Sequence, residues 1–531
     1  MPLADPEEAR CGLIVRDMLR HGQWLVPHLR GDPYFEKPAP FFWLAALAVR
    51  LTGNPELGGR LIPALAGLGA VLIAYAFALR VFRGAYAGLL AGLVLATSGE
   101  FLFMARWYRM DMPFAAAMWA ALWWFWRSED RRPAGQPLGK TATWVGFYLF
   151  CAVATLFKGP AGMVLPGGVV LGFLLLTRQY RRVLEFLSPA GLAAYFLVAA
   201  PWYVAVGIAA PGQGREFFLR QNVQRFLGSG GLGHDWPGIL YVPIVLAGML
   251  PWTIFLPGIV MRSFPRRWRV RGERPALLFL WLCALVPLVF FAVSGTKLAS
   301  YVLPVFAPLA VMVGGLLAAW VASHRPDKLL KLGARALATT VAVLVALPLA
   351  IELWLKVPGA WLIVPFGVGL AALCGMLYAL RHSRRAQFLG WAIAAVAATF
   401  LYLIVHTAPF AYDRMSTRTL AESVDPAELR AGRVCFWSNT RLSFLFYADL
   451  DDTWTFHHTR QGDLDMLAEW LGSEQPVYCM VTGPERLAEL RRACPEGLRT
   501  VAHQGGCWLI TNRGDSRLAA DAREGPPKRS P

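Results

Sequence analysis

Long apolar runs recur along most of this 531-residue chain. A run of about 20 apolar residues is long enough to cross a bilayer as a helix. Only 16% of the residues are charged, against about 25% in soluble domains. The sequence therefore predicts a polytopic α-helical membrane protein. The predicted spans cover residues 60–82, 85–104, 112–126, 144–157, 160–177, 189–208, 238–259, 275–293, 299–320, 336–356, 359–380 and 389–409.

Short clusters of Arg and Lys separate many of these spans and contribute to the formal net charge of +18. Short loops rich in Arg and Lys stay on the cytoplasmic side of a membrane, so the clusters require no nucleic acid as a partner. The remaining loops are then external: residues 1–59, 105–111, 209–237, 294–298 and everything after 410. The loops predicted to be cytoplasmic carry Arg80 and Arg83; Arg131, Arg132 and Lys140; Arg178, Arg181 and Arg182; Arg266, Arg267, Arg269 and Arg271; Lys328 and Lys331; Arg381, Arg384 and Arg385.

Residues 40–53, PFFWLAALAVRLTG, are too short to span a bilayer and contain Arg50. We expect them to lie at the outer surface as an interfacial helix, within a first outer loop over residues 1–59. An outer segment that precedes the first predicted span needs an earlier span to carry it across. Either the start was placed too late or a first helix has been lost. The first alternative predicts an in-frame apolar stretch of about 20 residues encoded just upstream of Met1, giving thirteen spans.

The hydropathy falls after Phe410, and we expect a small external α/β domain over residues 410–512. Three segments rich in β-branched and aromatic residues predict strands: RVCFWSN, PVYCMVTG and GCWLITN. Two segments between them, RLSFLFYADL and DLDMLAEWL, predict helices. Disulfides and buried free thiols are both open alternatives for the four cysteines of this domain. The polar tail, residues 513–531, is predicted to be disordered.

Polar and ionisable side chains gather at the predicted outer boundary of the membrane. They come from five separated segments, and charges at this depth are functional candidates by default. The clustering on one side favours a shared site over unrelated surface charges. The residues are Asp5, Glu7, Glu8, Glu36 and Lys37 in the first loop, then Asp111, Lys158, Arg225, His234, Lys297 and Tyr301.

Each of these residues also has a simpler structural explanation. Glu36 and Lys37 could form a solvated interfacial pair. Asp111 could pair with Arg109 at a helix start, where a carboxylate also suits the helix dipole. Lys158 could extend its ammonium group to the membrane surface.

Five motifs in the outer segments carry a family resemblance. The run DPEEARCGLIVRDMLRHGQWLVPHLRGDPYFEKPAPFFWL is similar to the first outer loop of bacterial GT-C glycosyltransferases. The segments ARWYRMDMPF, FKGPAGMVLP, NVQRF followed by a His, and SGTKLASYVLP resemble later motifs of the same enzymes. The group includes lipid A aminoarabinose transferases and protein O-mannosyltransferases. The resemblance covers residues 1–310 by motif and the last domain by architecture only. Glu7 stands where the family has Asp, and Cys11 where it has Tyr.

The resemblance implies transfer of a sugar, with inversion, from an undecaprenyl phosphate donor at the periplasmic face of a bacterial inner membrane. An aminoarabinose-type sugar and lipid A are the implied donor sugar and acceptor. Cations would stabilise the phosphate leaving group as its charge grows. The implied phosphate-binding residues are Lys37, Lys158, Arg225, Lys297 and Tyr301. The implied catalytic acids are Glu7, Glu8, Glu36 and Asp111, with Asp5, Asn222 and His234 as further candidates.

The task of the acidic residues depends on the acceptor. A hydroxyl acceptor needs a general base, and Asp111 or Glu7 would serve. A lipid A phosphate is already ionised and needs none. The acids would then bind the ammonium group of an amino sugar or a divalent cation, for which Glu36 is the candidate ligand. The expected partners are membrane lipids, and the protein is expected to be a monomer.

Three other functions compete with this hypothesis. Related transferases act on proteins or other glycans, which changes only the acceptor. A secondary transporter would place charged groups and broken helices near the bilayer midplane and often shows inverted repeats. Here the charges lie at one face and no repeat is visible. A scaffolding protein that binds a partner through its external domain is the third alternative.

Overall fold

The computed structural model describes residues 1–130, 141–211, 224, 237–263, 275–323, 327–355, 363–451, 453–460, 462–494 and 498–513. The chain divides into two compact units. One unit comprises Met1–Asp17, His28–Pro33 and Ala408–Pro531, and the other comprises Met18–Pro27 and Tyr34–Thr407. We refer to them as the sheet unit and the helical unit.

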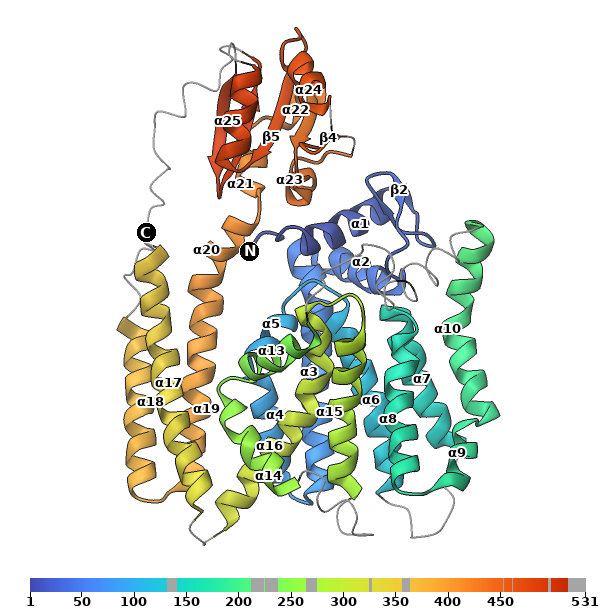
Figure 1. Cartoon of the computed structure of the whole chain (residues 1–531), viewed down its shortest axis with the longest axis vertical. Coiled ribbons are helices and arrows are strands. Elements are labelled where there is room, and N and C mark those ends of the chain that lie inside the picture. Colours follow the sequence, from blue (N-terminus) through green and yellow to red (C-terminus); the bar gives the residue numbers. More distant parts are fainter. Residues whose placement is uncertain are drawn as a thin grey trace. The chain divides into compact units, whose positions relative to one another are not determined.

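Helices that run alongside one another build the helical unit (Figure 1). Most of them begin and end close to the limits predicted from hydropathy. They are α2 (Pro40–Thr52), α3 (Pro55–Val81), α4 (Ala85–Ala96), α5 (Gly99–Met104), α6 (Asp111–Glu129), α7 (Thr141–Lys158), α8 (Ala161–Leu176), α9 (Tyr180–Phe186), α10 (Pro189–Ala209), η2 (Gly238–Leu240), α13 (Tyr241–Gly248), η3 (Trp252–Phe255), α14 (Leu256–Ser263), α15 (Pro275–Val293), η5 (Ala299–Val305), α16 (Phe306–Ala322), α17 (Lys328–Leu355), α18 (Ile363–Arg381), α19 (Arg385–Tyr402) and η6 (Leu403–Thr407).

Seven helical segments of the described residues are long and apolar enough to cross a membrane. This confirms a polytopic helical membrane protein, and helices cover most of the described residues of each predicted span. Two predicted spans are broken rather than continuous. Residues 85–104 divide into α4 and α5, and residues 238–259 form two arms bent by 108°. Pro251 lies in that bend, where its missing N–H interrupts helical hydrogen bonding.

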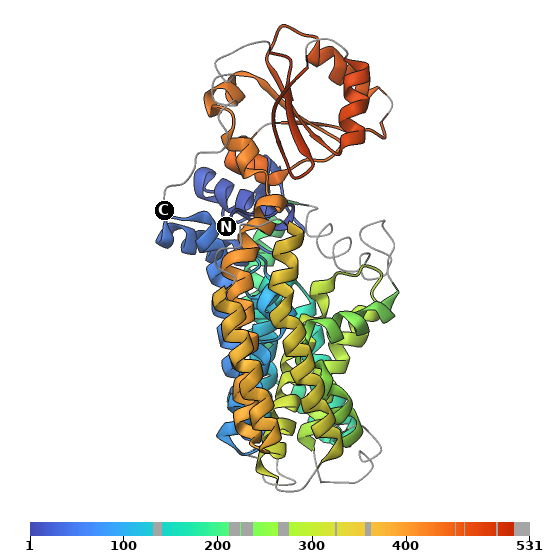
Figure 2. The same ribbon diagram turned by 90° about the vertical axis from the view of Figure 1, so that its left-hand side faces the viewer.

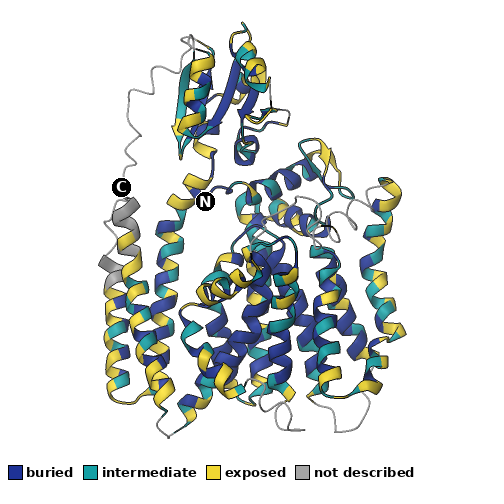
Figure 3. Ribbon diagram, in the orientation of Figure 1, coloured by how far each residue is buried: buried dark blue, intermediate teal, exposed yellow. Residues whose placement is uncertain are grey.

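The core of the helical unit lies along α6 and α16, whose residues are mostly buried. Buried residues are dark blue in Figure 3. Close approach of α16 to α4 depends on Gly314, because a Cβ there would lie 2.5 Å from the backbone of Ala91. Small residues permit such contacts between helices in membranes. Helices α17, α18 and α19 pack along one another (Figure 2). The central position of α6 holds its first residue, Asp111, in a fixed place.

The sheet unit contains a five-stranded sheet with the order β4-β3-β5-β7-β6. Strands β4, β3 and β5 are parallel, and β7 pairs antiparallel with β5 and β6. The elements are α1 (Glu7–His21, which continues into the helical unit), β1 (His28–Leu29), β2 (Asp32–Pro33), α20 (Ala408–Met415), α21 (Arg418–Glu422), α22 (Pro426–Ala431), β3 (Arg433–Trp437), α23 (Leu442–Tyr447), β4 (Trp454–Phe456), α24 (Asp463–Leu471), β5 (Val477–Thr482), α25 (Pro484–Ala493), β6 (Arg499–Gln504) and β7 (Cys507–Thr511).

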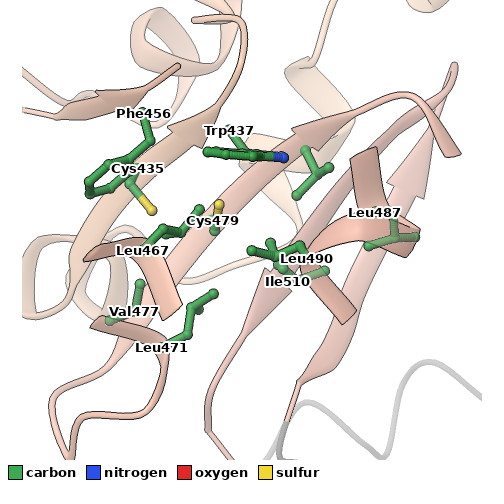
Figure 4. Packing of buried hydrophobic residues seen from close by; sticks show 11 residues of the cluster. Cys435, Trp437, Phe456, Leu467, Leu471, Val477, Cys479, Leu487, Leu490 and Ile510 are labelled. Atoms are coloured by element: carbon green, nitrogen blue, oxygen red, sulfur yellow. The ribbon is translucent and has the colours of Figure 1, made fainter. Parts of the chain in front are cut away.

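Residues from the sheet, α24 and α25 form an apolar core in this unit (Figure 4). Cys435 of β3 and Cys479 of β5 are opposite each other in the strand register and are fully buried. All eight cysteines are free thiols. Cys435, Cys479 and Cys507 are buried in strands, as in the second predicted alternative, whereas Cys494 follows α25 and is half-buried. The three predicted strands and two predicted helices of this domain are confirmed as β3, β5, β7, α23 and α24.

Candidate active site

Asp111, at the start of α6, lies between two cations of the helical unit. Its Oδ1 is 2.5 Å from Nζ of Lys158, and its Oδ2 is 3.1 Å from Nε of Arg109. The hydroxyl of Ser300 donates a longer hydrogen bond of 3.5 Å to Oδ1. The Asp111 side chain is only 2% exposed, and a buried charge is tolerated when oppositely charged groups compensate it. We therefore take Asp111 as ionised, with Arg109 and Lys158 as its counter-ions.

Local backbone structure explains how these residues meet. Lys158 is the last residue of α7, and α8 begins at Ala161. Gly159 makes this tight turn with φ +83°, a conformation that glycine adopts readily. Ser300 belongs to η5, which is tied to α6 because Trp119 Nε1–H donates to the carbonyl of Pro304 at 2.9 Å. The ends of three separate segments thus converge on one carboxylate.

Aromatic rings surround the ammonium group of Lys158. Its Nζ lies 4.5 Å from the ring centre of Tyr301, 5.1 Å from that of Phe114 and 5.8 Å from that of Phe291. Cations are attracted to ring faces at such distances. Tyr301 therefore contacts Lys158 through the face of its ring. The contacts of Lys158 orient its charge beside Asp111.

The segment that carries Glu36 and Lys37 approaches the Asp111 cluster through aromatic contacts. Phe41 lies 6.1 Å from Tyr108, measured between ring centres. Tyr108 belongs to the loop just before α6. Lys37 is close enough to Asp111 to stabilise its negative charge. Glu36 and Lys37 are both half-buried. Among the described residues Glu36 makes no ion pair, so its carboxylate is available for a ligand.

The loop before α6 also depends on Gly59 of α3. A Cβ at this position would lie 2.2 Å from the ring of Tyr108, so Gly59→Ala must displace the Tyr108 ring and the loop that precedes Asp111. We expect this substitution to lower both the thermal stability of the protein and its activity, since overpacking typically costs about 1–3 kcal/mol. Thermal unfolding and an activity assay on the purified protein measure the two effects.

Gly69→Ala is the matched control for this prediction. Gly69 lies in the same helix, and a Cβ there would meet no atom within 4 Å. The control should behave like the unmodified protein or be slightly more stable, because alanine favours helix. Equal effects of the two substitutions would show that the Tyr108 contact does not position the loop.

Lys297 lies in the loop between α15 and η5. Its ammonium group donates a 2.7 Å hydrogen bond to the carbonyl of Ser294 in the same loop, and the residue is half-buried. Three residues further on, Ser300 reaches Asp111. The structure thus places Lys297 on the segment that contributes to the cluster, and the observed partner of its charge is a backbone carbonyl.

The acidic residues of the N-terminus lie in the sheet unit and have local structural contacts there. Asp5 accepts a 2.8 Å hydrogen bond from the backbone N–H of Ser443 and another from the Ser443 hydroxyl. Burial raises the pKa of Asp5, and these hydrogen bonds oppose that effect. Glu8 is fully buried and accepts from the backbone N–H of Ala4 at 3.1 Å. Glu7 forms an ion pair with Arg10 at 3.3 Å.

The remaining predicted residues, Asn222, Arg225 and His234, lie outside the described residues. In the part of the chain that the structure describes, no three His, Cys, Asp or Glu side chains are grouped so that they could hold a metal ion. Glu36 therefore stands as a single candidate ligand.

Two further residues around Asp111, Ser300 and Glu100, are not predicted from the sequence, and Arg109 is predicted only as a local partner of Asp111. Glu100 of α5 lies close enough for the charge of Asp111 to act on it. Its Oε1 is buried and has no hydrogen-bond partner among the described residues. Glu100 is the lone acid in the predicted span 85–104, and an ionisable residue inside a span is a signal that could have identified it.

Comparison with known proteins adds independent information. The family model described as dolichyl-phosphate-mannose-protein mannosyltransferase matches residues 36–204. An undecaprenyl phosphate-alpha-4-amino-4-deoxy-L-arabinose arabinosyl transferase of Pseudomonas aeruginosa strain UCBPP-PA14 is 29% identical over 483 residues, which are 88% of this chain and 86% of the relative. The enzyme with the same name from Aeromonas salmonicida strain A449 is 32% identical over 313 residues, 59% of this chain and 55% of the relative.

Two solved structures share the fold. The crystal structure of ArnT from Cupriavidus metallidurans bound to undecaprenyl phosphate superimposes with a TM-score of 0.78 at 22% identity, covering 97% of this chain and 95% of that one. The archaeal oligosaccharyltransferase AglB from Archaeoglobus fulgidus superimposes with a TM-score of 0.53 at 13% identity, covering 91% of this chain and 66% of that one. The arrangement of helices and sheet therefore recurs in both proteins.

Proposed function

Because the chain is a membrane glycosyltransferase of the GT-C type, we propose that it transfers 4-amino-4-deoxy-L-arabinose from undecaprenyl phosphate to lipid A. The reaction takes place at the periplasmic face of a bacterial inner membrane. The names of the relatives support undecaprenyl phosphate-linked 4-amino-4-deoxy-L-arabinose as the donor. The proposal rests on the Asp111 cluster, where Lys158 and Arg109 pair with one buried carboxylate at the end of the bundle.

The reaction breaks the bond between the sugar C1 and a phosphate oxygen of the donor. Negative charge grows on the departing undecaprenyl phosphate, and cations in a partly desolvated site stabilise it. Lys37 is proposed as the cation that acts on the departing phosphate, because it is half-buried and its positive charge acts on the neighbouring Asp111. Arg225 and Lys297 are proposed as further phosphate ligands. Asp111 fixes the ammonium of Lys158, so both act in positioning the site.

The surroundings of Asp111 favour a phosphate acceptor. A carboxylate held by two cations is a weak base, because proton uptake would leave both cations uncompensated. A hydroxyl acceptor needs a base, whereas an ionised lipid A phosphate attacks C1 directly, which inverts its configuration. Glu36, without an ion pair in the described part of the chain, is then proposed to bind the ammonium group of the amino sugar.

Mass spectrometry of lipid A tests the acceptor. Lipid A from a deletion strain should lack a pentosamine addition that the parent strain carries. A plasmid copy of the gene should restore it, and a copy encoding Asp111→Asn should not. If the lipid A spectrum of the deletion strain is unchanged, lipid A is not the acceptor, and proteins or other glycans have to be examined.

A further inference from the structure

A cavity of about 790 Å³ lies at the far end of α6 from Asp111. Asp111 is the first residue of this helix, whereas Trp126 and Glu129 in its last turn line the cavity. At 1.5 Å per residue, Asp111 and Glu129 are about 27 Å apart along the helix. The cavity is therefore distinct from the site described above. Its volume lies within the range of pockets that hold organic ligands.

Many of the side chains that line the cavity are apolar. They come from helices that meet at this end of the bundle: α3, α6, α14, α15 and α16. The side chains that form this wall are Val81, Trp126, Ile259, Leu277, Met312 and Leu316. A wall of this kind favours a hydrocarbon chain, because burying apolar surface is favourable and water gains no hydrogen bonds there. A small hydrated anion gains no binding free energy from contact with an apolar wall.

The rim of the cavity is charged, and its acids are already neutralised. Glu129 accepts two hydrogen bonds from Arg182, at 3.1 and 2.8 Å. Asp130 lies 3.8 Å from Arg80. One cation of the rim, Arg262, is also neutralised, because it forms an ion pair with Asp327.

Arg83 is the other cation that lines the rim of the cavity. Among the described residues it has no ion pair, and the residue is exposed. It stands two residues after the end of α3 in a left-handed conformation, with φ +53°. The rim therefore offers one uncompensated positive charge next to an apolar wall.

We propose that this cavity binds one anionic glycerophospholipid. Its phosphate pairs with Arg83, and an acyl chain lies against Trp126, Leu277 and Met312. Only an amphiphile uses both features, since phosphate complements the free guanidinium and hydrocarbon covers the wall. Arg83 belongs to the loops that the charge pattern predicts to be cytoplasmic. The lipid is thus separate from the polyprenyl donor proposed to bind at the opposite end of α6.

Native mass spectrometry of the purified full-length protein with added phosphatidylglycerol tests this site. The unmodified protein should retain one phosphatidylglycerol more tightly than phosphatidylethanolamine. Arg83→Ala should weaken retention roughly tenfold, as expected for the loss of one charge-assisted contact. Ala276→Trp, which places a large ring at the cavity wall, should weaken retention of both lipids.

Arg178→Ala is the matched control. Arg178 is also exposed, stands two residues after the end of its helix, α8, and has φ +58°, but it does not line the cavity. The control should retain phosphatidylglycerol fully, and excess undecaprenyl phosphate should not displace that lipid. Equal losses in Arg83→Ala and Arg178→Ala, or displacement by undecaprenyl phosphate, would overturn the proposal.

A second measurement does not depend on the folding of a variant. Phosphatidylglycerol with a photoreactive group in its acyl chain should label peptides that contain Leu277 or Met312 in the unmodified protein. Labelling spread evenly over the lipid-facing helices, with no enrichment in these peptides, would also contradict the proposed site.

Discussion

Asp111→Asn should lower sugar transfer by roughly 100-fold or more, the magnitude typical for loss of one key electrostatic group in an active site. The substitution removes the negative charge that holds Lys158 at 2.5 Å and Arg109 at 3.1 Å. Two buried cations then lose their counter-ion, and breaking a buried pair in this way costs about 3–5 kcal/mol. We expect Lys158 to turn away from its place beside Tyr301. Initial rates with purified protein measure the effect.

Asp130→Asn is the control for this experiment. Asp130 follows the other end of α6 and pairs only loosely with Arg80, at 3.8 Å. Its substitution should leave the rate of transfer close to that of the unmodified protein. Both variants should insert into the membrane, and their rates are compared per amount of folded protein. Near-normal transfer by Asp111→Asn would remove Asp111 and its ion pairs from the proposed site.

Lys37→Ala should also reduce transfer by about 100-fold, mainly through kcat, because the charge of Lys37 is proposed to act on the departing phosphate. Lys37→Arg should recover part of the rate, since it keeps a positive charge on a side chain of different shape. Steady-state kinetics with varied donor concentrations separate kcat from KM.

Lys331→Ala is the control for Lys37, because Lys331 is exposed and belongs to a predicted cytoplasmic loop. The Lys331→Ala variant should transfer sugar at the same rate as the unmodified protein. If Lys37→Ala raises KM but leaves kcat unchanged, Lys37 serves only in donor binding. If it alters neither, Lys37 has no part in the reaction.

Hydropathy was sufficient to predict the helices of the bundle, because a helix in a membrane needs a run of apolar residues of fixed length. It could not predict the 108° bend between the two arms of residues 238–263. Pro251 lies at the bend, but Pro63 and Pro201 lie inside helices that continue without a break, so a proline alone does not show where a helix is interrupted. In the sheet, β6 (Arg499–Gln504) was missed because its sequence RTVAHQ is mostly polar and its residues are only partly buried.

For the candidate site, too, the sequence predicts where residues lie along the chain and the membrane, but not which residues contact one another. The sequence placed Asp111, Lys158 and Lys37 on one side of the membrane, because loop charges report orientation. It could not predict that Lys158 pairs directly with Asp111 across 47 positions, or that Ser300 joins them. Asp5 illustrates the limit most clearly. Its partner, Ser443, is 438 residues away, and sequence alone contains no signal for that contact.

Reconstituted transfer from donor to acceptor is the decisive measurement of the proposed activity. Purified protein in lipid vesicles would receive undecaprenyl-phosphate-linked 4-amino-4-deoxy-L-arabinose and lipid A, and both lipids would be followed by mass spectrometry. We predict that the sugar appears on a lipid A phosphate with inverted configuration, that undecaprenyl phosphate is released in equal amount, and that Asp111→Asn forms almost no product. An intact donor in the presence of folded, unmodified protein would contradict the proposed transferase activity.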